Sequence, residues 1–262
     1  GVIPFEQKGT ALRQKKNPKE ALLLDSPVVS MGFAEAGRRI AAKVEYHMRR
    51  HRQKMLLVSS IAENEGKSTV AANLALALAE KHKKVLLVDG DLRRPAQHKV
   101  FEEKGKKRLS FSRVLKGETD WKDAAFYNRR SDIWELFQFR AVREPARILR
   151  EEKLAGLAEE WKREMDYIII DCSPVAVSVD AEVWVSVADS VLLVVREDWA
   201  DVRVINDAVD MISQNGTDFT GFVLNAFHRE WSRPAGRQEY SYGRAYRSQE
   251  MPGEGLTGRS GE

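Results

Sequence analysis

The chain has one cysteine, no long apolar stretch and little excess of charge, and each shortage narrows what it can be. Cys172 is the only cysteine in 262 residues, so an internal disulfide is impossible and a reducing compartment fits best. No apolar run approaches the roughly 18 residues that span a bilayer, and no signal peptide is recognisable. The net charge of +4 gives no argument for a nucleic-acid partner.

The remaining composition is that of an ordinary globular protein. Hydrophobic residues make up 43% of the chain and charged residues 31%. A chain of 262 residues can form one large α/β domain. The first residue is Gly1 rather than Met, so we expect a piece of a longer protein.

A phosphate-binding loop is the most informative feature of the sequence. Apolar Met55–Val58 predicts a buried strand, Ser59–Glu65 a polar loop, and Gly66-Lys67-Ser68-Thr69 the start of a helix. Elements in this order hold phosphates with backbone N–H groups and the positive end of the helix dipole. Ile61 stands where the usual pattern has its first glycine, so this stretch alone leaves an ordinary turn open.

Three acids follow other apolar runs of the sequence. Asp89 and Asp91 come after one such run and Asp171 after another. Ligands of open parallel sheets bind at the carboxyl ends of the strands. Carboxylates and the Ser68 hydroxyl suit Mg²⁺, and a spare carboxylate can accept a proton from an attacking hydroxyl. Any one of these acids alone would indicate a cap or turn, but together they indicate a metal-nucleotide site.

Four polar residues near these acids have a less specific interpretation. Arg93 and Arg94 can pair equally well with phosphate or with acidic neighbours. Asp180 stands ahead of a predicted helix and is expected to cap it. Cys172 is expected to be a small residue behind Asp171, because no second thiol or activating base accompanies it.

Apolar strands alternating with helices predict a parallel sheet covered on both faces, an α/β fold. Further strands are predicted at Lys84–Val88, Ile133–Phe139, Tyr167–Ile170, Asp189–Arg196 and Phe219–Asn225. Helices are predicted at Met31–Arg50, within Glu144–Met165 and at Val202–Ser213, with irregular helical structure over Ala96–Tyr127.

The composition divides the chain into three parts. Residues 1–30 are a basic lead-in, residues 31–228 the nucleotide-binding domain, and residues 229–262 a tail rich in Arg, Gly, Ser, Glu and Tyr that we expect to be flexible.

These residues resemble the bacterial tyrosine kinase family of capsular and exopolysaccharide biosynthesis, P-loop proteins with a MinD/ParA-like fold. The resemblance covers about Glu35 to Asn225. Ser59–Ala75 is similar to the Walker A loop and helix, Asp166–Val175 to Walker B, and Phe222–Asn225 to the strand whose terminal Asn contacts adenine. Val85–Pro95 is similar to the family's additional Walker A′ motif and is the most specific match.

The resemblance implies an ATP- and Mg²⁺-dependent protein-tyrosine kinase with named site residues. Its catalytic residues would be Lys67, Asp89, Asp91 and Asp171. Its nucleotide-binding residues would be Glu63, Asn64, Glu65, Gly66, Lys67, Ser68, Thr69 and Asn225. Its metal ligands would be Ser68, Asp89 and Asp171, and how Asp89 and Asp91 divide the metal and base roles is left open.

The tail supplies phosphate acceptors in this interpretation. Tyr240, Tyr242 and Tyr246 are three of only six tyrosines and lie among residues that cannot bury them. The resemblance to the family implies that these tyrosines form a cluster phosphorylated in trans by a neighbouring subunit. The alternative is that the tail is a featureless mobile end. Each phosphate would add roughly −1.5 to −2 charge.

Departures from the family pattern concern the loop and the oligomer contact. Glu63-Asn64 stands where typical members have Pro-Gly, which should change the shape of the loop more than its phosphate chemistry. Glu35 and Arg38 resemble a ring-forming motif whose second Arg would fall at Ala41, and Arg39 or Lys43 would have to substitute.

The resemblance also implies partners and a location. Gly1–Phe5 is similar to the stretch after the second transmembrane helix in members fused to a chain-length-determinant membrane domain; a separate membrane adaptor is the alternative. We therefore expect a homo-oligomer, itself soluble, at the cytoplasmic face of the bacterial inner membrane, with a cognate tyrosine phosphatase and no nucleic acid.

Two rival functions share this fold. ParA/MinD-type ATPase switches carry an extra Lys early in the loop, and its place here is Ala62, which weighs against them. An ATP-binding regulatory protein without kinase activity is the second rival, and the altered loop is its supporting feature.

Overall fold

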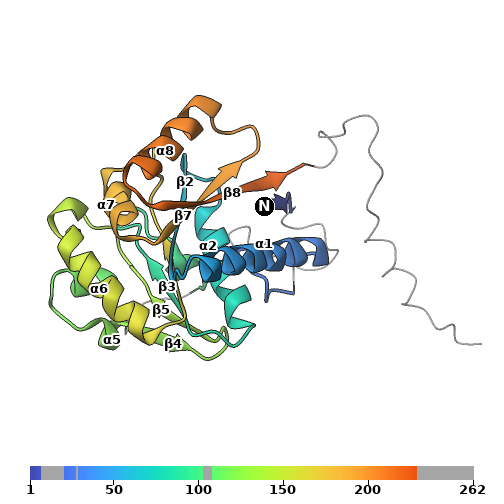
Figure 1. Ribbon diagram of the computed structural model, residues 1–262. Coiled ribbons are helices and arrows are strands. Elements are labelled where there is room, and N and C mark those ends of the chain that lie inside the picture. The colour runs from blue at the N-terminus through green and yellow to red at the C-terminus, as the bar shows by residue number, and fades with distance from the viewer. Residues whose placement is uncertain (7–20, 28, 103–107, 229–262) are drawn as a thin grey trace, which may run out of the picture. The chain divides into compact units, whose positions relative to one another are not determined.

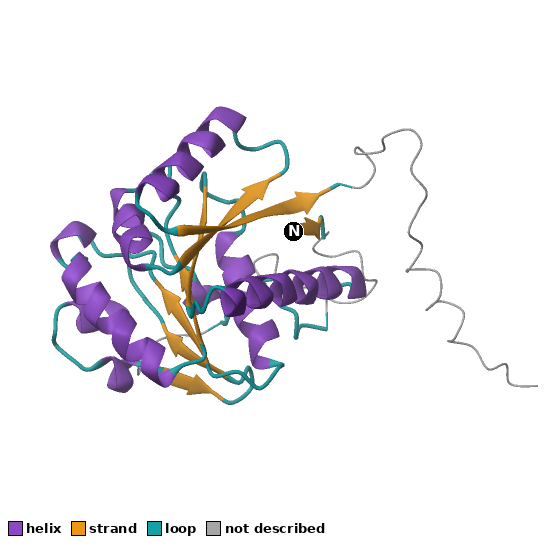
Figure 2. Cartoon of the chain, viewed as in Figure 1, coloured by secondary structure: helices purple, strands orange, loops and turns teal. Residues whose placement is uncertain are grey.

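The apolar strands of the sequence assemble into one sheet in the part of the chain that the computed structural model describes, residues 1–6, 21–27, 29–102 and 108–228 (Figures 1 and 2). The strands are β1 (Val2–Pro4), β2 (Met55–Ser60), β3 (Val85–Asp89), β4 (Phe126–Asn128), β5 (Ile133–Leu136), β6 (Tyr167–Asp171), β7 (Ser190–Arg196) and β8 (Asp218–Phe227). The helices are α1 (Met31–Arg50), α2 (Lys67–Ala79), α3 (Gln97–Val100), α4 (Phe111–Leu115), α5 (Trp121–Ala124), η1 (Pro145–Arg147), α6 (Glu151–Glu164), α7 (Val179–Val187) and α8 (Val202–Gln214).

The order of the strands is β1-β8-β7-β2-β6-β3-β5-β4, and only the β4–β5 pair is antiparallel. Parallel strands joined through helices need cover on both faces, which is why the central strands are apolar along their whole length. The predicted α/β class, a parallel sheet with helices on both sides, is confirmed.

Alternate residues of each central strand enter different cores. In β2, Met55 and Leu57 face a core shared with α4 to α8, and Leu56 and Val58 face a core shared with α1 and α2. Figure 1 shows α6, α7 and α8 on one side of the strands and α1 on the other. The sheet is thus the middle of three layers, and its loops project from the two edges where strands end.

The long elements agree with the sequence prediction. α1 spans Met31–Arg50 as expected and begins at the N-cap Ser30, whose hydroxyl accepts a hydrogen bond of 3.1 Å from the N–H of Phe33. The region predicted as one or two helices is the short η1 followed by α6. Strand β4 was not predicted; it overlaps the end of the region expected to be helical and irregular.

The two described segments of the lead-in, residues 1–6 and 21–27, pack on the sheet and on α2. β1 adds a parallel strand beside β8, and Ile3 is 4% exposed in the core next to α1. The buried amide of Asn73 on α2 then fixes the chain before α1, because it accepts from Leu24 N–H and donates to Leu22 C=O, both at 2.8 Å. A buried amide with both groups satisfied holds a segment that has little apolar periodicity of its own.

The first strand gives a stability prediction. Ile3→Ala should lower the free energy of unfolding by about 2–5 kcal/mol, because a buried methyl-rich side chain is replaced by a cavity. Val2→Ala is the matched control on the same strand: Val2 is 48% exposed, and the change should stay within about 0.5 kcal/mol. Urea titration of both variants measures this, and equal small effects would mean that β1 does not contribute to the stability of the sheet.

Candidate active site

The candidate active site lies at the edge of the sheet where β2, β3 and β6 end. β6 runs between β2 and β3, so the three carboxyl ends meet at one place. Asp171 is in register with Val58 on one side and with Asp89 on the other. Asp89 and Asp171 have no exposed surface, and the parallel register alone therefore brings two buried carboxylates side by side.

Lys67, the first residue of α2, provides a positive charge next to these carboxylates. Its Nζ lies 3.0 Å from Asp91 Oδ2 and 3.6 Å from Asp171 Oδ1. The other oxygen of Asp91 accepts a hydrogen bond of 2.9 Å from the N–H of Arg94. Lys67, Asp89, Asp91 and Asp171, which the sequence predicted as one constellation, lie together in the structure.

Gln97 is a site residue that the sequence reasoning missed. Its Nε2 donates to Asp171 Oδ2 at 2.9 Å and to the carbonyl of Ser68 at 3.0 Å. The backbone N–H groups of Ala96 and Gln97 both donate to Asp89 Oδ2 at 3.0 Å. Gln97 therefore connects the end of β3, the end of β6 and the start of α2. Its only sequence signal is its place just after the acidic turn.

Two buried carboxylate oxygens in this site, Asp89 Oδ1 and Asp171 Oδ1, accept no hydrogen bond from the described residues. The ammonium group of Lys67 lies 3.6 Å from Asp171 Oδ1, and the other oxygen of each acid does accept hydrogen bonds. A buried, unpaired carboxylate oxygen is costly, and hard divalent cations prefer oxygen ligands of this kind. With the Ser68 hydroxyl at the start of the same helix, these residues fit a bound Mg²⁺ ion.

The pKa values reflect the same imbalance of charge. Burial, together with the neighbouring Asp171, raises the pKa of Asp89 well above its usual value. Burial also raises the pKa of Asp171, against the opposing charge of Lys67. Burial disfavours the charge on Lys67, but the carboxylates of Asp171 and Asp91 outweigh it and raise its pKa. The site is thus short of positive charge, which a cation would supply.

The loop before α2 depends on Gly66 and Asn225. Gly66 has φ +92°, and a side-chain carbon there would lie 2.2 Å from Asn225 Nδ2. That amide donates to the carbonyl of Glu65 at 2.8 Å, so the end of β8 holds the loop. The predicted adenine-contacting Asn225 therefore lies beside the phosphate loop, and glycine is the residue that both the backbone and the space allow.

The other loop residues divide into inward and outward groups. The Glu65 side chain is buried and braces the loop: its carboxylate accepts from Ala62 N–H at 2.7 Å and from Arg196 N–H at 3.3 Å. Asn64 is exposed with φ +64°, and Thr69 is half-buried on the first turn of α2. Glu65 can therefore meet a phosphate only through its backbone.

The two arginines after the acidic turn each pair with an acidic side chain. The Arg93 guanidinium contacts both oxygens of Asp180, at 2.6 and 3.1 Å, and Arg94 pairs with Glu63 of the loop. Both arginines thus have acidic partners in this structure. Asp180 is not the helix cap that the sequence suggested, because Ser178 occupies the N-cap of α7.

Cys172 agrees with its sequence interpretation. It is fully buried, and that burial raises the pKa of its thiol. A thiol with a raised pKa is a poor nucleophile at neutral pH.

The remaining predicted residues lie elsewhere. Glu35 and Arg38 are on the exposed side of α1, where Arg38 pairs with Glu80 at 2.8 Å and Glu35 lies 3.7 Å from Arg39. Tyr240, Tyr242 and Tyr246 lie outside the described residues.

Comparison with known proteins agrees with this site. Residues 57–215 match a family model described as AAA domain. This segment contains the four charged residues of the site, Lys67, Asp89, Asp91 and Asp171. The chain is 30% identical over 172 residues to tyrosine-protein kinase CpsD of Streptococcus agalactiae, covering 66% of this chain and 75% of the relative. It is 26% identical over 193 residues to putative tyrosine-protein kinase CapB of Staphylococcus aureus, covering 74% and 84%.

Solved structures share the fold. The kinase domain of Escherichia coli tyrosine kinase ETK superposes with a TM-score of 0.75 at 22% identity, covering 92% of this chain and 93% of that one. The septum site-determining protein MinD from Pyrococcus horikoshii, complexed with Mg-ADP, gives a TM-score of 0.58 at 26% identity, covering 67% and 71%. With the matched family model and the curated relatives, these findings show that the chain belongs to the AAA-domain P-loop proteins and, among them, to the bacterial tyrosine kinases.

Proposed function

We propose that this chain transfers the γ-phosphoryl group of ATP to tyrosine hydroxyls of proteins, first of all to its own C-terminal tyrosines. The observation that carries the proposal is the convergence of Lys67 with Asp89, Asp91 and Asp171 beside the phosphate loop. The names of the relatives, tyrosine-protein kinases, support a protein tyrosine as the acceptor.

The start of α2 is the binding site for the phosphates. The first N–H groups of a helix have no partner inside the helix, and here Lys67, Ser68 and Thr69 carry them. Lys67 would exchange Asp91 for the phosphate oxygens, because its ammonium group is already at that edge of the loop. Mg²⁺, held by Asp89, Asp171 and Ser68, would neutralise charge that develops on the phosphates.

The structure offers a way to divide the roles of the acids. Asp89 and Asp171 each keep one oxygen beside the loop that accepts no hydrogen bond from the described residues, which suits them for the cation, directly or through water. Both oxygens of Asp91 are engaged, and among the described residues only Lys67 holds Oδ2. When phosphate takes Lys67, that oxygen of Asp91 is released. Asp91 is therefore our candidate for the base.

The proposed step balances as a simple displacement. The tyrosine oxygen bonds to the γ-phosphorus while the bond between that phosphorus and the ADP oxygen breaks. The phenol proton passes to the Asp91 carboxylate. Tyr240, Tyr242 and Tyr246 are the proposed acceptors, reached in trans by a neighbouring copy.

Autophosphorylation is the first test of the proposal. Wild-type protein incubated with Mg-ATP should carry phosphate on Tyr240, Tyr242 and Tyr246, mapped by mass spectrometry. Lys67→Met should lower the rate at least about 100-fold, because the variant loses a charged group that faces the transferred phosphate.

The same experiment separates kinase from ATPase switch. If ATP is hydrolysed while the three tyrosines stay unmodified, the kinase proposal fails and a MinD-type switch is the better description. If neither happens although nucleotide binds, the chain is an ATP-binding regulatory protein.

The division between the acids has its own test. Asp91→Asn should bind Mg-ADP nearly as wild type but lose phosphoryl transfer by about 10²- to 10⁴-fold, the usual contribution of general base catalysis. Asp89→Asn is the matched variant from the same turn and should weaken Mg²⁺-dependent binding of nucleotide. Fluorescence titration with a labelled ADP, with and without Mg²⁺, measures the difference; the reverse pattern would exchange the two roles.

The oligomer contact is proposed on the exposed side of α1. The second Arg of the family motif would fall at Ala41, which has no exposed surface because that side of α1 packs on the core. Arg39 and Lys43 are exposed beside Arg38 and are the residues that can replace it.

Sizing of the intact chain tests this contact. The double variant Glu35→Ala, Arg38→Ala should shift the protein toward monomer in light scattering. Glu80→Ala is the control, because it breaks the pair between Arg38 and α2 within the chain but leaves Arg38 free for a neighbouring copy. An unchanged oligomer in the double variant would remove α1 from the interface.

The cellular role is proposed from the same relatives. None of the helices in the described part of the chain has the length and apolarity that crossing a bilayer requires. We infer a membrane chain-length-determinant domain, fused or separate, as the partner at the inner membrane, and a cognate phosphatase that reverses the modification. Control of exopolysaccharide or capsule synthesis would follow from the phosphorylation state.

A further inference from the structure

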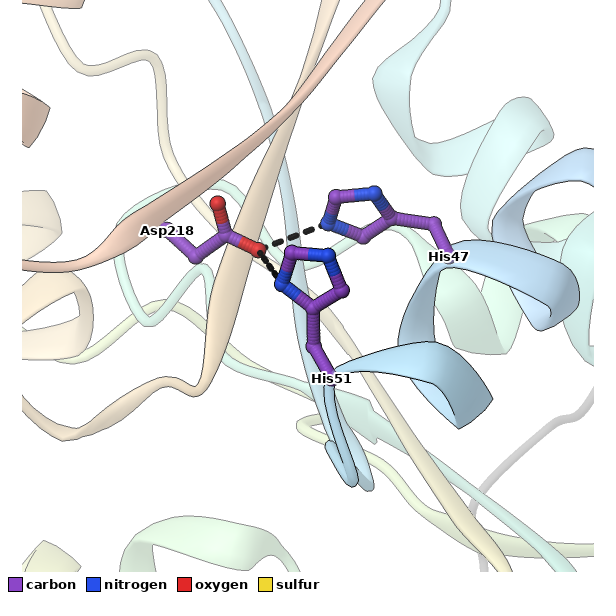
Figure 3. A group of neighbouring side chains, drawn as sticks. All are labelled: His47, His51 and Asp218. Atoms are coloured by element: carbon purple, nitrogen blue, oxygen red, sulfur yellow. Dashed lines mark hydrogen bonds and ion pairs between the residues drawn. The ribbon is translucent and has the colours of Figure 1, made fainter.

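A second cluster of titratable side chains lies at the opposite edge of the sheet. His47 and His51 come from the C-terminal end of α1, and Asp218 is the first residue of β8 (Figure 3). Asp218 pairs in register with Ser190 at the start of β7, so the cluster faces the amino ends of the strands rather than the active-site edge. No step proposed for the kinase uses these three residues.

The two imidazoles converge on one carboxylate oxygen. His47 Nε2 lies 2.6 Å and His51 Nδ1 3.4 Å from Asp218 Oδ2. The rings are stacked with their centroids 4.4 Å apart and an angle of 24° between their planes. The three ligand atoms lie within 4.8 Å of one another, and Figure 3 shows the nitrogens of both rings turned toward the same oxygen.

The backbone fixes this geometry. Residues four apart on a helix lie on the same face, which stacks His51 beside His47. The helix closes directly afterwards: the N–H of Gln53 donates to Met48 C=O at 2.8 Å and that of Arg52 to Arg49 C=O at 3.3 Å, with Arg52 at φ +57°. This is a Schellman ending, and it places Gln53 next to the cluster.

Gln53 orients the acid. Its Nε2 donates to Asp218 Oδ2 at 2.9 Å, and Oδ1 of Asp218 makes no such contact with another described residue. The cluster therefore presents two imidazoles and a carboxylate that is held by a neighbouring amide, which resembles the outer support of metal-bound carboxylates.

We propose that His47, His51 and Asp218 form a binding site for a divalent transition-metal ion of the Zn²⁺ class. Two imidazole nitrogens and one carboxylate oxygen, with water in the fourth position, satisfy tetrahedral coordination. Ligand atoms around tetrahedral Zn²⁺ lie about 3.3 Å apart; the 3.4 Å between His51 and Asp218 is close to this spacing, and the 2.6 Å between His47 and Asp218 would have to widen.

The surroundings select this ion class. The side chains of His47, His51 and Asp218 are 26%, 44% and 33% exposed, so an ion can enter and keep a water ligand. The negative end of the α1 helix dipole favours a cation. The positive charges of the exposed Arg49, Arg50 and Arg52 disfavour a bound cation. An ion held by charge alone, such as Mg²⁺ or Ca²⁺, would therefore gain too little binding free energy. An ion that bonds strongly to imidazole fits.

The ion would join two elements that are distant in the sequence. It would attach the C-terminal end of α1 to the start of β8, whose other end carries Asn225 of the active site. The proposal concerns a structural site, and it stands or falls independently of the kinase activity.

Zinc binding by the full chain tests the site. Zn²⁺ is titrated against a chromophoric chelator in excess Mg²⁺ and ADP, which keep the active site filled. Wild type should bind one equivalent, and His47→Gln, His51→Gln and Asp218→Asn should each weaken binding at least about tenfold, since loss of even an outer-shell partner costs 10- to 100-fold. His82→Asn, at an exposed histidine outside the cluster, should bind as wild type.

A second measurement keeps the test independent of folding. Melting curves with and without Zn²⁺ should show a rise in Tm for wild type and His82→Asn that EDTA reverses. The cluster variants should melt as cooperatively as wild type in EDTA but gain nothing from Zn²⁺. Equal zinc binding in all variants, or none in wild type, would overturn the proposal; the three residues would then be a hydrogen-bonded cluster only.

Discussion

The register of three parallel strands is the constraint on which the active site depends. Because β2, β6 and β3 are neighbours and run in the same direction, Asp89 and Asp171 must end side by side, away from water. Two buried carboxylates cannot both stay charged without compensation. Lys67 and the side-chain amide and backbone N–H of Gln97 supply part of it, but one oxygen of each acid still accepts no hydrogen bond from the described residues. The repulsion between the two buried carboxylates favours a bound cation at this place.

The loop and the far strand solve a separate problem, which is to hold an irregular backbone open for a ligand. Gly66 has a left-handed φ, and the Asn225 amide leaves no room for a side chain there. The Glu65 carboxylate turns inward and accepts hydrogen bonds from two backbone N–H groups. The loop is thus fixed by β7 and β8 without using the groups that phosphate needs. This explains how Glu63-Asn64 can replace a Pro-Gly pair: the stabilising contacts come from Glu65 and Gly66.

The sequence predicted the sheet, α1 and the four charged residues of the site, because long apolar runs and the spacing of acids after them are local signals. It did not predict Gln97, whose role depends on a turn that returns it to Ser68 and Asp171. It did not predict β1, whose only buried side chain is Ile3 and whose pairing with β8 joins residues more than 200 positions apart. Asp180 was misassigned because an acid near a helix start resembles a cap, whereas Ser178 takes that place and Asp180 meets Arg93. Contacts of this kind are set by the tertiary fold, which no local pattern contains.

α1 connects the two ends of this molecule. Its buried side, with Ala41, packs on the sheet and on α2, the helix that begins at Lys67. Its exposed side presents Arg38, and its C-terminal end presents the histidines to β8. A neighbouring copy that docks on α1 would compete with Glu80 for Arg38, and so would act directly on α2. The helix that was expected to assemble subunits therefore packs directly on the helix that begins at the candidate phosphate loop.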